Sequence, residues 1–315
     1  STYNTGVGYE AGLSVTTGIQ NTFVGGLAGD AITTGDANVA VGAYALGSDD
    51  TGNKSTAIGD SALFSQNNDS DEDSNNVGVG YTAGYQNVLG KSNTYIGAEA
   101  GLGVSGNSNS SNVGVGTASM KGITTGAFNT AVGANSLLVI TTGEANTAIG
   151  HGALDANTTA HYNTAVGYNA LTANIAATHN TAVGHSALAA NTAGANNTAV
   201  GNAVLDANVE GSENTAMGRG ALSSDTYGSK STALGRNALT TQNRTTATDT
   251  YNVAVGYDAG LEVTTGLKNT FIGGLAGDDT VDSSDNTAVG YDALSGDSGG
   301  TCTAIGSNAL QATTG

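Results

Sequence analysis

The sequence predicts an all-β fold, a parallel β-solenoid in which about 18 short coils of the chain stack on one another. Three observations carry this prediction: a nine-residue phrase that recurs along all 315 residues, a nearly constant 17-residue spacing between its copies, and a composition with 49 Gly and neither Pro nor Trp. A 17-residue unit is too short for a helical hairpin repeat, which needs about 33 residues. It is long enough for one coil of a β-solenoid.

The recurring phrase is Asn-Thr-Ala-Val-Gly-x-x-Ala-Leu, and its glycine marks the same position in eighteen units. Successive marker glycines are 17 residues apart except for two gaps of 21, one of 19 and one of 16. The marker glycines are Gly8, Gly25, Gly42, Gly59, Gly80, Gly97, Gly116, Gly133, Gly150, Gly167, Gly184, Gly201, Gly218, Gly235, Gly256, Gly273, Gly290 and Gly306. We therefore expect one continuous repeat region over residues 1–315.

The residues just before each marker glycine predict a short strand. Three residues before it, every unit has Thr or Val, and one residue before it sixteen units have Val or Ile, while the position between them is usually Ala. Alternation with a period of two is typical of a strand, and β-branched residues favour it. The glycine then permits a sharp corner.

Four residues before the marker, fifteen units carry Asn, and Ser55, Ser231 and Cys302 replace it in the others. Stacked Asn side chains can donate and accept hydrogen bonds along the stack, which predicts an amide ladder. The segments between units vary in length and are rich in Thr, Gly, Asn and Asp, so we expect insertions to bulge outward.

A volume exchange between two columns predicts which side chains share the interior. Six units have Gly four residues after the marker, where the others have Leu or Met, and the second unit of each adjacent pair has an aromatic residue two before the marker. The pairs are Gly12 and Gly29 with Phe23, Gly84 and Gly101 with Tyr95, and Gly260 and Gly277 with Phe271. Close-packed interiors penalise uncompensated volume changes, so we infer that both columns face one packed space.

The Thr/Val and Val/Ile columns point to the opposite face of the same strand. Because an apolar column is rarely left wholly exposed, we expect this face to be covered as well. Neighbouring copies of the chain are the favoured cover, which predicts a homo-oligomer, and a three-sided monomeric solenoid is the alternative.

Charge excludes two classes of partner. The formal net charge is −18 with only eight Lys or Arg, which argues against binding nucleic acid and against anionic membrane surfaces. No apolar run approaches the roughly 20 residues that span a bilayer, so we expect no membrane insertion, and no leader is evident at the N-terminus. The single cysteine, Cys302, excludes an internal disulfide framework.

A candidate contact surface is the column directly after the marker glycine. This position is variable but carries five tyrosines, Tyr9, Tyr81, Tyr168, Tyr257 and Tyr291. Exposed tyrosines in a row can stack on sugar rings or contact a partner. Ordinary packing at the surface is the interpretation that we favour.

The densest acidic run, Asp69, Asp71, Glu72 and Asp73, has the spacing that begins a calcium loop. It lacks the glycine at the sixth position and the glutamate at the twelfth, so it fails the EF-hand test, and a solvated loop is the better interpretation.

Four histidines, His151, His161, His179 and His185, lie within three coils. His151 and His185 share a column but are two coils apart, about 10 Å by strand spacing, which is too far for one ion. The acidic residues lie mostly in variable loops without a recurring carboxylate pair of the kind a glycoside-cleaving site needs. We expect no catalytic site, no metal and no cofactor.

The repeat resembles known fibre repeats. Units such as Asn163-Thr-Ala-Val-Gly-Tyr-Asn-Ala-Leu171 and Asn286-Thr-Ala-Val-Gly-Tyr-Asp-Ala-Leu294 resemble the repeats of bacteriophage tail-fibre-type proteins and are similar to the head repeats of trimeric autotransporter adhesins. The resemblance covers essentially the whole chain. It implies a trimeric, left-handed β-roll that serves as an extracellular fibre shaft on a cell surface or virion. It also implies that any cell-surface glycan or receptor is bound through other regions.

Two other functions stay open. Thr columns at β spacing also occur in ice-binding solenoids, although Val39, Val77, Val113 and Val253 interrupt the column here. A self-assembling filament is the other, because neither end has a polar cap and uncovered coil ends are adhesive edges. Joining Gly315 to Ser1 would keep the 17-residue spacing, so we expect a segment of a longer repeat or a subunit that stacks end to end.

Overall fold

The computed structural model describes residues 2–68, 72–296 and 299–311, and these residues contain strands and turns but no helix. The chain divides into two compact units, Ser1–His161 and Tyr162–Gly315. Within each unit the strands pair in parallel with the strand of the next coil, so each is a parallel β-solenoid. The predicted all-β solenoid with its 17-residue period is confirmed.

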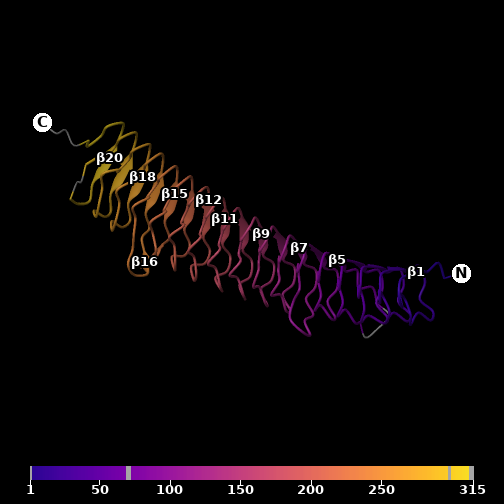
Figure 1. The fold of residues 1–315 in the computed structure, drawn as a ribbon. Helices are drawn as coiled ribbons and strands as arrows, with labels where there is room; N and C mark the ends of the chain where they lie inside the picture. The colour runs from indigo at the N-terminus through magenta and orange to yellow at the C-terminus, as the bar shows by residue number, and fades with distance from the viewer. Residues whose placement is uncertain (1, 69–71, 297–298, 312–315) are drawn as a thin grey trace. The chain divides into compact units, whose positions relative to one another are not determined.

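In the first unit each coil contributes one three-residue strand to the sheet, and Figure 1 shows these strands following one another in chain order. They are β1 (Thr5–Val7), β2 (Thr22–Val24), β3 (Val39–Val41), β4 (Thr56–Ile58), β5 (Val77–Val79), β6 (Thr94–Ile96), β7 (Val113–Val115), β8 (Thr130–Val132) and β9 (Thr147–Ile149). Residues of the same column pair directly, so that Thr5 faces Thr22 and Val7 faces Val24.

The second unit repeats this arrangement and adds one short pair of strands. Its sheet contains β10 (Thr164–Val166), β11 (Thr181–Val183), β12 (Thr198–Val200), β13 (Thr215–Met217), β15 (Thr232–Leu234), β17 (Val253–Val255), β18 (Thr270–Ile272), β19 (Thr287–Val289) and β20 (Thr303–Ile305). The two-residue strands β14 (Gly228–Ser229) and β16 (Thr248–Asp249) pair with each other, and in Figure 1 β16 lies away from the main row.

The corner after each strand explains why the marker residue is glycine. Gly25 has a φ of +138°, and a Cβ placed on it would lie 2.5 Å from the carbonyl oxygen of Gly42 in the next coil. The backbones of successive coils therefore approach too closely for any side chain, and the φ value is one that L side chains rarely adopt.

The interior of each coil is built from the predicted Ala and Leu columns. Ala57 and Leu63, which belong to one coil, are both fully buried. The volume exchange is also confirmed: a Cβ on Gly12 or Gly29 would come within 2.7 or 2.4 Å of the Phe23 ring. The rings of Tyr95 and Phe271 occupy the same space beside their own glycine pairs.

The Asn column forms a ladder whose side chains bond to the backbone as well as to one another. The Oδ1 atom of Asn21 accepts a hydrogen bond from the backbone N–H of Asn38 (2.9 Å), and its Nδ2 donates to the carbonyl oxygen of Gly35 (2.8 Å). The side chain therefore mainly links backbone groups of its own coil and the next one. The predicted amide-to-amide bonds occur in this column as well, in an unbroken run from Asn146 to Asn129 (3.1 Å), from Asn129 to Asn112 (3.2 Å) and from Asn112 to Asn93 (3.2 Å).

A second Asn column, seven residues after the marker, also contains amide-to-amide hydrogen bonds. In the second unit, Asn191 Nδ2 donates to Asn174 Oδ1 (3.3 Å), and Asn208 Nδ2 donates to Asn191 Oδ1 (2.8 Å). These three side chains are fully buried. Because buried amides need partners, these hydrogen bonds stabilise the interior of the successive coils.

Candidate functional site

The outward face of the strands is the most regular surface of each unit. Val24, Ile58, Ile96, Val132 and Ile149, which come from one column of the first unit, each leave between 36% and 41% of their surface exposed. In the second unit Met217 and Ile272 of the same column are exposed by 50% and 41%. In a single chain this face is therefore open to solvent rather than covered.

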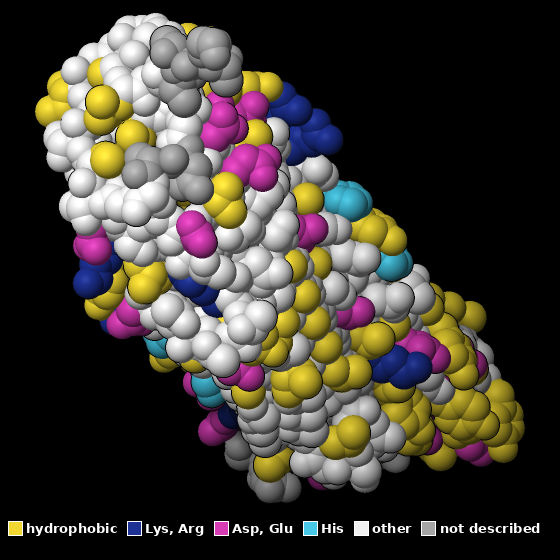
Figure 2. All heavy atoms as spheres, turned by 90° about the vertical axis from the view of Figure 1, so that its left-hand side faces the viewer, with side chains coloured by type: hydrophobic (Ala, Val, Ile, Leu, Met, Phe, Trp, Pro, Cys, Tyr) yellow, Lys and Arg dark blue, Asp and Glu magenta, His cyan; other side chains and the backbone are white. Residues whose placement is uncertain are grey.

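Charged side chains are missing from the strands that form this face. None of the three-residue strands within the described residues contains Asp, Glu, Lys, Arg or His. Figure 2 shows hydrophobic side chains in rows from coil to coil on the face that it presents. We call the Thr/Val and Val/Ile columns of these strands the outer strand face.

The five predicted tyrosines are all exposed, but they do not form a continuous row. Within each unit, coils with other residues at this position separate one tyrosine from the next. Tyr168 stacks on His185, with ring centroids 5.4 Å apart. The guanidinium of Arg236 lies over the Tyr257 ring, 5.2 Å from its centroid. Tyr9 and Tyr291 are exposed by 73% and 58%.

Tyr81 differs from the other four because it lines a hollow of about 560 Å³ in the first unit. Tyr85, Gln86, Leu102, Ser61 and Ser105 also line this hollow. Tyr85 stacks on Phe64 with centroids 5.2 Å apart, and Phe64 packs edge-on against Tyr44 at 6.4 Å. Three successive coils thus present adjacent rings.

Two segments with the 21-residue gaps share one arrangement. We call residues 42–105 module 1, which lies in the first unit, and residues 218–281 module 2, which lies in the second. Adding 176 to a residue number in module 1 gives the equivalent residue in module 2. Both modules contain the long gap followed by a Gly pair with its aromatic ring.

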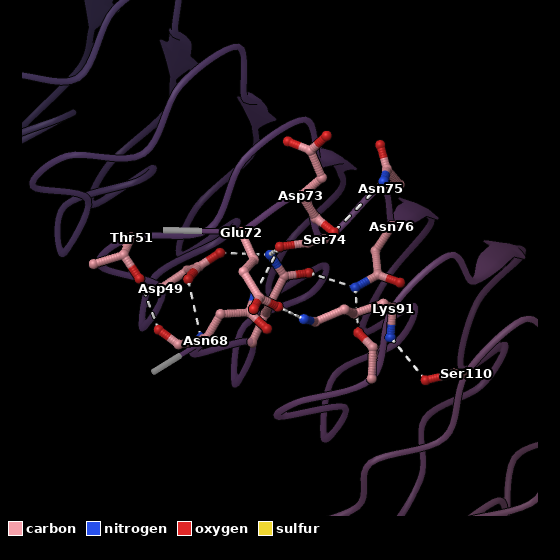
Figure 3. Close-up of polar contacts among 12 residues, drawn as sticks. Asp49, Thr51, Asn68, Glu72, Asp73, Ser74, Asn75, Asn76, Lys91 and Ser110 are labelled. Atoms are coloured by element: carbon pink, nitrogen blue, oxygen red, sulfur yellow. Dashed lines mark hydrogen bonds and ion pairs between the residues drawn. The ribbon is translucent and has the colours of Figure 1, made fainter. Parts of the chain in front are cut away.

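In module 1 a buried polar network replaces the ladder at Ser55. Gln66 Nε2 donates to Asp49 Oδ2 (2.5 Å) and to Ser55 Oγ (3.0 Å), while its Oε1 accepts from Asn76 Nδ2 (2.8 Å). Asp49 Oδ1 also accepts from the Gly52 N–H (3.1 Å), and Figure 3 shows how Asp49, Asn68 and Asn76 converge on this region. The small serine makes room for the glutamine.

Module 2 repeats this network with equivalent residues. Gln242 Nε2 donates to Asp225 Oδ2 and to Ser231 Oγ (2.9 Å), and its Oε1 accepts from Asn252 Nδ2 (2.8 Å). Burial raises the pKa of both Asp49 and Asp225, and the hydrogen bonds from the glutamines partly offset this. Arg244, which has no basic equivalent in module 1, additionally lowers the pKa of Asp225 by its charge.

The acidic run considered for calcium is only partly described. Asp69 and Asp71 lie outside the described residues. Glu72 forms an ion pair with Lys91, and Asp73 forms one with Lys54 (2.5 Å). Lys230 and Asp249 form the module 2 equivalent of the Lys54–Asp73 pair (2.6 Å). This ion pair is therefore a shared feature of the two 21-residue coils.

His161 and His179 contact a backbone group and an aromatic ring, respectively. His161 Nδ1 accepts from the backbone N–H of Glu144 (3.0 Å), and the His179 ring stacks on Tyr162 at 5.0 Å. Over the described ranges, no group of three or more His, Cys, Asp or Glu side chains is arranged to hold a metal ion.

Sequence reasoning missed the hollow and the two polar networks. The networks had a signal: each long gap follows a unit in which Ser replaces the ladder Asn and Gln stands seven residues after the marker. The ring run beside the hollow also had a signal, because Phe64 and Tyr85 stand in the same column, five residues after the marker, in adjacent units. Tyr44 comes from another column and meets Phe64 only through the coil geometry.

Comparison with known proteins leaves the family open. A scan of known protein-family models finds no match, and neither does a search of curated proteins. Across the part of the chain that the structure describes, there is no helix with the length and apolar character needed to span a membrane. The fold and the outer strand face are therefore the basis for a functional proposal.

Proposed function

We propose that the chain is a structural, non-enzymatic shaft segment of an extracellular fibre, in which copies of the chain associate through the outer strand face. The observation that carries this proposal is the column of half-exposed Val and Ile residues, with Val24, Ile58 and Ile96 in the first unit and Ile272 in the second. Apolar surface of this extent and regularity is typical of a protein interface.

A second copy of the chain is the partner that this face fits. Each strand repeats the same Thr-x-Val or closely related pattern at one coil spacing, so the face of one copy has the same period as the face of another. The acidic residues that give the chain its charge of −18 lie outside the three-residue strands. Repulsion between copies is therefore smallest where the outer strand faces meet.

The resemblance to phage tail-fibre-type and adhesin-head repeats supports a trimeric, left-handed arrangement at a virion or cell surface. In such an assembly the shaft spaces or displays an attachment tip that other parts of the fibre supply. Burial of the outer strand faces around a common axis would give the fibre its stiffness.

Sedimentation equilibrium over a range of low protein concentrations tests the proposal. We expect a mass three times that of the 30.7 kDa chain. Electron micrographs with mass per length should show particles with three chains in cross-section. An endless filament would favour end-to-end stacking, and a monomer at every concentration would refute the association.

A matched pair of variants localises the interface. Ile58→Lys with Ile96→Lys places two charges on the outer strand face and should convert the trimer to monomers. Leu89→Lys with Val139→Lys changes residues of similar exposure outside the strands and should leave the mass unchanged. Equal dissociation in both variants would show that the interface lies elsewhere.

One observation favours ice binding as a second candidate. In the second unit Thr164, Thr181, Thr198, Thr215 and Thr232 form an uninterrupted column on the outer strand face, with paired registers throughout. The column is at least partly exposed, so the face that would pack in a trimer would instead be free to order water. Thermal hysteresis and ice shaping by the monomer would support this function, and their absence would exclude it.

A further inference from the structure

The hollow in module 1 is lined by both aromatic and polar side chains. Tyr81, Tyr85 and Leu102 line it with apolar surface, and Gln86, Ser61 and Ser105 add amide and hydroxyl groups. Its volume of about 560 Å³ is within the range of small-ligand sites. All of these residues lie outside the strands.

Module 2 shows that the solenoid does not require these aromatic residues. The positions of Tyr44, Phe64 and Tyr85 are taken in module 2 by Gly220, Thr240 and Leu261, although the backbone arrangement and the buried network are the same. Gln86 and Leu102 correspond to Glu262 and Asp278. The fold therefore does not explain why module 1 has aromatic residues at these three positions.

The surroundings of the shared tyrosine also differ. In module 2 the Arg236 side chain lies over the ring of Tyr257 and donates to its hydroxyl (2.8 Å). Module 1 has Asp60 at the position of Arg236, and Asp60 Oδ1 accepts a hydrogen bond from Ser61 Oγ (2.9 Å). The Tyr81 ring, 58% exposed, thus lacks the cationic cover that its counterpart has.

We propose that this hollow of module 1 is a binding site for a neutral, hexopyranose-containing glycan. The apolar face of a pyranose ring packs on an aromatic ring, and Tyr81 and Tyr85 both line this hollow, with one face of the Tyr85 ring stacked on Phe64. The Gln86 amide and the serine hydroxyls both donate and accept, which matches the hydroxyl groups on the rim of a sugar.

Charge selects a neutral sugar over an acidic one. Asp60 accepts a hydrogen bond from Ser61, which lines the hollow, and a carboxylate accepts hydrogen bonds from sugar hydroxyls but repels a sugar acid. The nearby Lys121 is paired with Glu99 (2.7 Å), so it does not supply a free cation for an anionic ligand. The chain's overall charge of −18 acts in the same direction.

Saturation-transfer NMR with the full chain tests this site, using maltohexaose and cellohexaose as neutral probes and oligogalacturonate as the acidic one. We expect transfer to at least one neutral probe and none to the acidic probe. The variant Tyr85→Leu with Gln86→Glu installs the module 2 residues, which this backbone already accommodates, and it should weaken binding about tenfold or more.

The control is Tyr257→Ala. Tyr257 is the module 2 equivalent of Tyr81, and its loss should leave glycan binding unchanged. Circular dichroism and the urea midpoint of each variant report whether it is folded. Failure of both neutral probes to bind, stronger binding of the acidic probe, or equal binding by the wild type and a folded Tyr85→Leu/Gln86→Glu variant would each overturn the proposal. None of these outcomes depends on the oligomeric state.

Discussion

Module 1 and module 2 have the same interior and different surfaces. Inside, both place an aspartate, a serine and a glutamine in one hydrogen-bonded network, and both follow it with two glycines against an aromatic ring. On the surface, module 1 carries Phe64 and Tyr85 where module 2 carries Thr240 and Leu261. The comparison separates residues that build the coil from residues that are free to serve a ligand.

The largest effect is expected where the shared interior is broken. Phe271→Ala should lower the free energy of unfolding by about 3–5 kcal/mol, because a buried ring is lost between Gly260 and Gly277. Gly277→Leu should cost about 1–3 kcal/mol or more, because its Cβ alone would lie 2.5 Å from the ring. Urea unfolding followed by circular dichroism measures both.

Combining the changes should rescue the fold. A triple variant, Phe271→Ala with Gly260→Leu and Gly277→Leu, recreates the composition around Ala182, which lies between Leu171 and Leu188 in the ordinary coils. It should be more stable than the variant with Phe271→Ala alone or the variant with Gly277→Leu alone, because the free-energy changes of substitutions at residues in contact do not add. A triple variant whose loss equals the sum of its parts would show that ring and leucines do not exchange for one another.

This interior was predictable from the sequence because it repeats. Most units have Leu four residues after the marker, and the units around Phe23, Tyr95 and Phe271 have Gly there instead. This exchange indicated that the two columns share one interior. The details of the Asn ladder were not predictable, because an amide side chain bonds equally well to another amide or to the backbone, and only the coil geometry places the Gly35 carbonyl beside Asn21 Nδ2. The hollow was not predictable either: Tyr81 belongs to the tyrosine column, but Tyr85, Gln86 and Leu102 are not shared with module 2 and gave no repeating pattern.

A smaller effect should distinguish the two polar networks. Gln66→Leu removes the donor to buried Asp49, and Gln242→Leu removes the donor to Asp225. Each should cost about 1–3 kcal/mol at neutral pH, because a buried carboxylate loses a partner. We expect the loss to be larger for Gln66→Leu, because the charge of Arg244 still stabilises ionised Asp225.

The pH dependence of these variants provides the check. The folded-state pKa of Asp49 is raised above its ordinary value of 3.8, so burial of the charge costs stability at neutral pH and protonation relieves this cost as the pH falls through the folded pKa. The difference between Gln66→Leu and Gln242→Leu should therefore narrow in acid. A constant difference across this range would contradict the role given to the Asp49 charge.

The smallest effect is expected at Asp278, which occupies the position of Leu102 on the surface of module 2. Burial first, and then the charges of Asp279 and Asp292, raise the pKa of Asp278 to about 6. Because the folded pKa is raised, the ionised group destabilises the fold above pH 6, and its protonation removes this penalty as the pH falls toward 3.8. Solvent screening keeps the effect small.

Asp278→Asn should therefore raise the urea midpoint slightly at pH 7, and this gain should disappear by about pH 4, the ordinary range of the group. Asp279→Asn should lower the pKa of Asp278 without returning it to 3.8, because burial is the larger cause. A gain from Asp278→Asn that is the same at pH 7 and pH 4 would mean that the side chain's packing, rather than its charge, distinguishes this surface from that of module 1.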